Sequence, residues 1–91
     1  MTTENLNNHN EAPLLALGFD DAILGYEMNS MRAVYSKDKM VEILMKDMSE
    51  EDAVEFLTYN VWGAYVGKQT PIYIDEMDGE ELISHFQIKN A

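Results

Sequence analysis

Residues 31–67, MRAVYSKDKMVEILMKDMSEEDAVEFLTYNVWGAYVG, contain the signals for one strand and two helices in succession. The first part, residues 31–36, carries β-branched and aromatic residues and predicts a strand that ends at Ser36, where a helix N-cap belongs. The apolar residues that follow recur at helical spacing on one face: Met40, Val41, Leu44, Met45 and Met48. Ser49 predicts a second N-cap ahead of three acids in the first turn, and Gly67 predicts where that second helix ends.

The neighbouring segments predict the remaining elements. Residues 22–28 have the composition of a strand that pairs with residues 31–36 in a hairpin, because the Asn-Ser pair between them is typical of a turn. Residues 71–74, PIYI, alternate and branch as a third strand does, and proline is tolerated at its first position. Residues 75–86 predict an acidic turn and then a short amphipathic segment whose apolar residues are Leu82, Ile83 and Phe86.

Together these elements predict an α+β fold. We expect a small two-layer domain in which the β-hairpin and the third strand form one antiparallel or mixed sheet, with the two helices packed on one face. A chain of 91 residues supports one domain, and we place it at residues 13–91. Residues 1–12 are polar with almost nothing to bury, so we predict a disordered N-terminal tail.

The charge balance is the strongest compositional signal, with 17 acidic residues against 6 basic ones and a net charge of −11. Nucleic acids and anionic membranes repel such a chain, so we expect no direct nucleic-acid partner and no membrane partner, whereas a basic protein remains a permitted partner. The start MTTENLNNHNEAP is too polar for a signal peptide, and no apolar run approaches the roughly 18 residues that a membrane helix needs. The chain holds no cysteine, which excludes disulfides and thiolate metal sites and fits a cytoplasmic location.

The sequence offers no catalytic pattern. His9 lies in the predicted tail, and His85 follows Ser84 directly, so on a helix the two side chains point apart and form no nucleophile–base pair. The segment DEMDGEE fails the calcium-loop pattern, which would place Ile74 at the first ligand position. Helix capping and solvation also account for the acids of the second helix, Glu50, Glu51, Asp52 and Glu55. We therefore predict no enzyme activity, no metal and no cofactor.

Two residues of the second helix stand out when it is projected at about 100° per residue. Asn60 falls inside the apolar arc, where an unpaired amide costs about 1–3 kcal/mol. We interpret it as a structural polar residue bonded to a strand or loop backbone, with a ligand contact as the alternative. Trp62 falls on the opposite side, flanked by Tyr59 and Val66, and these three predict a protein interface unless the C-terminal segment 82–86 covers the indole.

The combination of DDAILGYE, AVYSKDKMVEILM and MSEEDAVEFLTYNVWGAYVGKQTPIYI resembles a group of small conserved hypothetical proteins of tailed bacteriophages and some bacteria. The resemblance covers about residues 20–74. In that group a glycine often precedes the methionine between the helices, whereas here Asp47 precedes Met48, which implies a tighter turn. The most specific part follows the acidic helix start: Tyr59-Asn60, Gly63-Ala64-Tyr65, Gly67 and Thr70-Pro71. The resemblance implies a phage-related context, and host cytoplasm if the chain is phage-encoded, but no chemistry.

Two functional hypotheses follow. The first is a non-enzymatic small acidic protein that works as a protein-interaction module, through self-association or a protein partner, because the aromatic side of the second helix and seven methionines offer adaptable apolar surface. The alternative is an acidic inhibitor that imitates nucleic acid on a host DNA- or RNA-binding protein. The two differ in salt dependence, since binding to a basic partner weakens with salt and apolar self-association does not.

Overall fold

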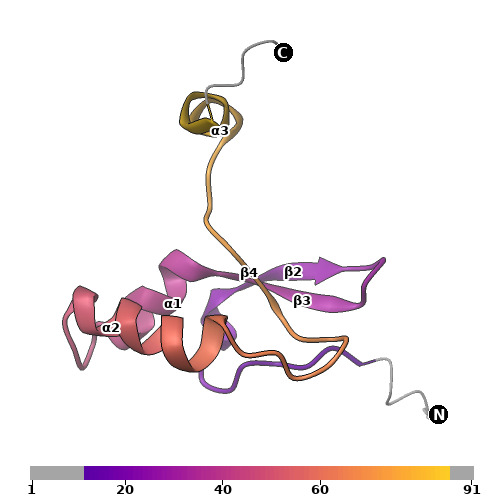
Figure 1. The fold of residues 1–91 in the computed structure, drawn as a ribbon, viewed down its shortest axis with the longest axis horizontal. Coiled ribbons are helices and arrows are strands. Elements are labelled where there is room, and N and C mark those ends of the chain that lie inside the picture. The colour runs from indigo at the N-terminus through magenta and orange to yellow at the C-terminus, as the bar shows by residue number, and fades with distance from the viewer. Residues whose placement is uncertain (1–11, 87–91) are drawn as a thin grey trace.

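The computed structural model describes residues 12–86, which form an α+β domain with a three-stranded mixed sheet and three α-helices (Figure 1). The predicted fold class is confirmed, whereas the tail predicted for residues 1–12 lies outside the described residues except for Ala12. The elements follow in the order η2 (Asp20–Ala22), β2 (Ile23–Glu27), β3 (Arg32–Ser36), α1 (Lys37–Leu44), α2 (Glu50–Leu57), η3 (Thr58–Trp62), β4 (Ile72–Ile74) and α3 (Gly79–Phe86). Among these residues, no helix is long and apolar enough to cross a membrane.

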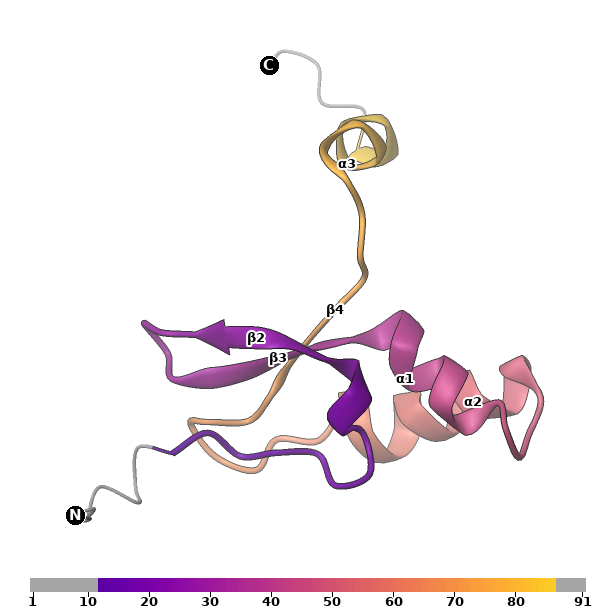
Figure 2. The same cartoon turned by 180° about the vertical axis from the view of Figure 1, so that it is seen from behind.

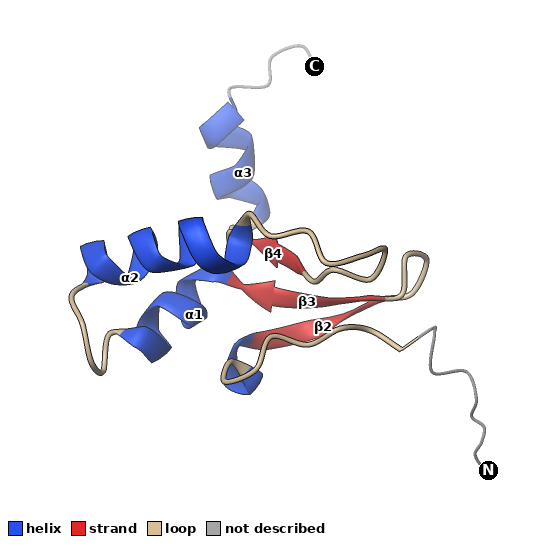
Figure 3. Cartoon of the chain, turned by 60° about the horizontal axis from the view of Figure 1, so that its bottom comes forward, coloured by secondary structure: helices blue, strands red, loops and turns tan. Residues whose placement is uncertain are grey.

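The sheet has the strand order β2-β3-β4 and contains both kinds of pairing. β2 and β3 form the predicted antiparallel hairpin, with Tyr26 opposite Ala33. β3 and β4 run parallel, with Val34 opposite Ile72, so the chain needs a crossover between them. The helices α1 and α2 supply that crossover and lie beyond the carboxyl end of β3 (Figure 3).

Both predicted helix caps are present. The Ser36 hydroxyl accepts a hydrogen bond from the backbone N–H of Lys39, at 3.1 Å, and α1 begins at the next residue. The Ser49 hydroxyl does the same for Asp52, also at 3.1 Å, and opens α2. Each cap satisfies one of the backbone donors that a helix start leaves without an intrahelical partner.

The second helix ends earlier than its sequence predicts. α2 stops at Leu57 and passes into the π-helical turn η3, which ends at Trp62, so the helix does not continue to Gly67. Gly63 is a poor helix former and caps this end. Farther along, the Thr70 hydroxyl accepts from the backbone N–H of Val66 and donates to the carbonyl of Gly67, which closes a turn in place of the predicted last helical turn.

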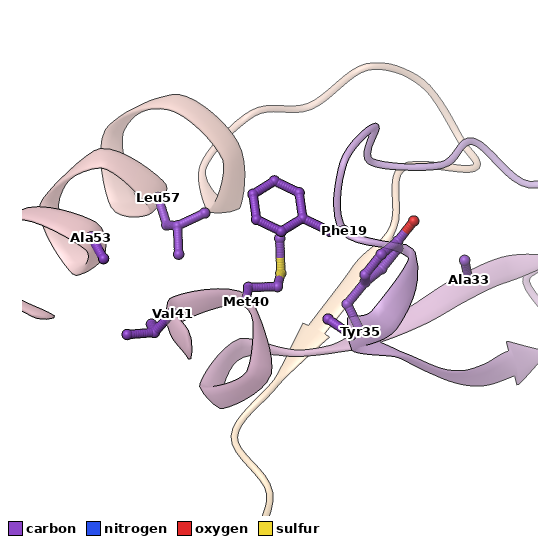
Figure 4. Packing of buried hydrophobic residues seen from close by; sticks show 8 residues of the cluster. Phe19, Ala33, Tyr35, Met40, Val41, Ala53 and Leu57 are labelled. Atoms are coloured by element: carbon purple, nitrogen blue, oxygen red, sulfur yellow. The ribbon is translucent and has the colours of Figure 1, made fainter. Parts of the chain in front are cut away.

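The core lies where α1, α2, β3 and the N-terminal segment meet (Figure 4). Tyr35, Met40 and Leu57 are its largest fully buried side chains. In Figure 4 the Met40 side chain reaches toward the Phe19 ring, with Leu57 beside it. On α2, Leu57 is fully buried, whereas its neighbour Phe56 remains 44% exposed because it lies on the side of the helix that faces solvent.

The two faces of the sheet have different surroundings. Residues 12–19 and residues 63–71 run along the same face, as Figures 1 and 2 show, and the backbone N–H of Leu14 bonds the carbonyl of Gln69. The backbone N–H of Ala16 donates to the buried hydroxyl of Tyr35, which ties this layer to β3. α3 stands off on the other side, at the end of an extended linker. This arm contributes to a radius of gyration of 16.0 Å, against about 12 Å for a compact domain of this length.

Candidate protein interaction site

A groove runs between α1 and α2, and both of its walls carry apolar side chains. One wall is a row of residues spaced four apart along α1 and its C-cap, Lys37, Val41 and Met45, and the other is the corresponding row on α2 and η3 that includes Val54 and Trp62. Met45 is 46% exposed and Val54 is 39% exposed, so these apolar positions are open to solvent. The rim is polar and mostly acidic: Asp38, Glu42, Glu50, Thr58 and Asp75. An apolar centre with a polar rim is the usual anatomy of a protein interface.

Trp62 forms one end of this groove and is held in place by α1. Its indole N–H donates to the sulfur of Met40 at 3.5 Å, and the ammonium of Lys37 lies 4.4 Å from the centre of the ring. The same ammonium lies 3.9 Å from a carboxylate oxygen of Asp75. The indole is therefore half-buried against α1, and the C-terminal segment 82–86 does not cover it.

The structure separates the three residues that the sequence assigns to one interface. Trp62 lines the groove between the helices, whereas Val66 lines a second, uncharged hollow beside the N-terminal segment that includes Leu17. Tyr59 is 79% exposed and lines neither of them. Helical projection placed them together because it continued a regular helix through residues 59–66. The helix instead changes to a π turn and ends at Trp62.

Asn60 differs from its prediction in the location of its partner. Its side chain does bond a backbone group, as expected of a structural amide, but it is exposed and the partner lies in its own helix rather than in a strand or loop. Its side-chain amide donates to the carbonyl of Phe56 at 3.0 Å, within its own helix. This bond lies where the helix passes from α2 into η3, so Asn60 supplies a donor to the backbone at that irregularity.

α3 presents its apolar face to solvent. All eight of its residues are exposed, and Leu82, Ile83 and Phe86 are 46%, 60% and 60% exposed. The helix begins with a reciprocal cap, in which the Asp78 carboxylate accepts from the backbone N–H of Glu81 and the Glu81 carboxylate accepts from the N–H of Asp78. This cap was not predicted from the sequence, although the Asp-x-x-Glu spacing at residues 78–81 is the signal for it.

The linker to α3 is fixed at one point. The Ser36 hydroxyl, fully buried, donates to the carboxylate of Glu76 at 2.6 Å while it also caps α1. A hydrogen bond to a charged group at this distance belongs to the stronger class. Only Met77 and Asp78 separate this anchored residue from the start of α3.

The electrostatics of the described residues are local and structural. The pKa of Glu27 is lowered by hydrogen bonds from the Ser30 hydroxyl and from the backbone N–H groups of Ser30 and Asn29. These bonds stabilise the hairpin turn. Burial, with a smaller effect of Tyr35, raises the pKa of Tyr73. Within residues 12–86, no group of three or more His, Cys, Asp or Glu side chains is placed to hold a metal ion.

Comparison of the chain with protein-family models, with characterised proteins and with solved structures finds no match. The groove and α3 are therefore the features from which a function is proposed.

Proposed function

We propose that this chain is a non-enzymatic protein-interaction module that works by self-association, in the phage-related context that its sequence resemblance implies. The observation that carries the proposal is the apolar face of α3, which is exposed over its whole length. An amphipathic helix of eight residues is marginal in water unless its apolar face packs against something. A partner that covers this face supplies the missing burial.

A second apolar surface supports the same proposal. The groove between α1 and α2 leaves Met45 and Val54 partly open beside an indole that α1 holds in place. Tryptophan is among the residues that most often carry the binding energy of protein interfaces. The chain thus presents both an apolar helix and an apolar groove.

The acidic surface favours this function over imitation of nucleic acid. Several carboxylates already have partners within the fold: Glu27 in the hairpin turn, Asp75 beside Lys37, Glu76 on Ser36, and Asp78 with Glu81 in the α3 cap. Three more, Glu50, Glu51 and Asp52, occupy the first turn of α2, where the helix dipole favours them. These interactions within the fold account for the presence of these acids without a basic partner.

The test is the solution mass of the full chain, measured by light scattering from low to high micromolar concentration at low and high salt. We expect a species heavier than the monomer that persists at high salt. The triple variant Leu82→Ser, Ile83→Ser and Phe86→Ser should be monomeric, because it removes the apolar face and leaves the cap of α3 intact. A wild-type chain that is monomeric throughout this range would refute self-association.

A further inference from the structure

We propose that α3 of one chain docks into the groove between α1 and α2 of a second copy, and that the second copy returns the contact. This inference rests on the proposed self-association and specifies its interface. Its elements are the arm, defined here as residues 75–86, and the groove, defined by Lys37, Val41, Met45, Val54 and Trp62. A reciprocal exchange of arms closes a two-fold dimer and leaves neither apolar surface open.

The arm and the groove match in length and in pattern. α1, α2 and α3 each contain eight residues, so each is about 12 Å long. The groove lies between two rows of side chains spaced four apart, which is the surface into which a third helix packs a ridge. Leu82, Ile83 and Phe86 provide such a ridge, since residues three and four apart lie on one face of a helix.

The arm does not occupy the groove of its own chain. Asp75 lines the rim of the groove, so the arm starts beside it. The bond from Ser36 to Glu76 then holds the next residue, and the three residue steps from Glu76 to Gly79 span about 11 Å at most. Figures 1 and 2 both show the arm leading away from α1 and α2. In this position the apolar side chains of α3 stay exposed and the groove of the same chain stays open, which leaves both surfaces for a second copy.

Charge gives this interface a distinctive salt dependence. Each chain carries a net charge of −11. Part of this charge lies at the proposed interface: Asp38, Glu42 and Glu50 are on the groove rim, and Glu80 and Glu81 are on α3. Two such copies repel each other, so screening by salt tightens the exchange. A basic foreign partner would show the opposite trend, because salt weakens attraction between opposite charges.

The experiment uses one variant that disables the arm and one that disables the groove. Ile83→Asp places a charge on the apolar face of α3, and Val54→Asp places one on the α2 wall of the groove. Leu17→Asp is the matched control, because Leu17 is 91% exposed and lines the other hollow. Circular dichroism checks that each variant folds, and Met45→Asp, from the α1 wall, replaces Val54→Asp if the latter does not. The masses of the variants are then measured alone and in an equimolar mixture.

We expect Ile83→Asp and Val54→Asp each to raise the dissociation constant by roughly tenfold or more, while Leu17→Asp leaves it unchanged. Their mixture should regain a dimer, because the intact arm of one variant fits the intact groove of the other. A mixture that stays as monomeric as its components overturns the proposal. If Ile83→Asp breaks the dimer and the groove variant leaves it intact, α3 pairs with itself, which overturns this interface but keeps the proposed function. A wild-type chain that is monomeric refutes both the proposed interface and the proposed self-association.

Discussion

Replacement of Ser36 by alanine tests the residue that joins the fold to the arm. The Ser36 hydroxyl has two roles: it caps α1 by accepting from the N–H of Lys39, and it donates to the carboxylate of Glu76. Loss of a serine N-cap costs about 1 kcal/mol. The second bond reaches a charged group, but Glu76 is exposed and regains water when the bond is lost, so we assign it about 0.5–1 kcal/mol. The free energy of unfolding should fall by about 1.5–2 kcal/mol.

The chain supplies its own matched control. The Ser49 hydroxyl caps α2 with a 3.1 Å bond to a backbone N–H, as Ser36 does for α1. It has only this capping role, whereas Ser36 also bonds Glu76. Ser49→Ala should therefore cost about 1 kcal/mol, and Glu76→Ala should cost about as much as the difference between the two serine variants. In a domain of this size 1 kcal/mol shifts the melting temperature by about 4–8 °C.

The assay is urea unfolding followed by circular dichroism, at one fixed protein concentration because self-association raises apparent stability. The double variant Ser36→Ala with Glu76→Ala should be no less stable than Ser36→Ala alone, since both changes remove the same bond. Equal costs for Ser36→Ala and Ser49→Ala would refute the second role of Ser36. Additive costs in the double variant would refute the direct contact.

Three further predictions follow. Tyr35→Phe leaves the backbone N–H of Ala16 without its 2.8 Å partner and should cost about 1–2 kcal/mol in thermal unfolding, whereas Tyr65→Phe, at a side chain that is 77% exposed, should change nothing. Gly67→Ala should lower the free energy of unfolding by about 1–3 kcal/mol, because Gly67 has a φ of 129°. Gly25→Ala is the control, since an added Cβ there meets nothing within 4 Å. Equal losses of stability in the two variants would contradict the role of the backbone angle. An NMR titration should find the pKa of Glu27 below its ordinary value and higher in Ser30→Ala. Because the folded pKa is the lower one, the stability from this turn is present above the unfolded pKa and is lost as the pH falls through the folded pKa.

Local signals in the sequence were sufficient for the elements that local chemistry controls. Ser36 and Ser49 were predicted as caps because a capping hydroxyl acts on a backbone N–H three residues away. The hairpin followed from two strand-like segments and the turn between them. The groove could not be predicted in this way, because Val41 and Val54 meet only after the two helices pack.

The errors arose where a regular pattern was extended past the point at which the chain changes geometry. Asn60, Tyr59 and Val66 were placed by a constant 100° step, which the π turn η3 breaks. The partner of Trp62 was sought in the C-terminal segment, whereas Met40 and Lys37 of α1 provide it. Contacts between residues more than 20 positions apart depend on tertiary packing, which the periodicity of one segment does not contain.

A crosslink between the arm of one copy and the groove of another would show the proposed contact in solution. The chain has no cysteine, so single cysteines can be introduced by Ile83→Cys, Val54→Cys and Leu17→Cys. The Ile83→Cys chain is tagged, mixed with each of the others and treated with a short thiol crosslinker. We expect a rapid crosslink between Ile83→Cys and Val54→Cys and a slow one with Leu17→Cys. Equal rates in the two mixtures, or crosslinks only between tagged chains, would contradict it.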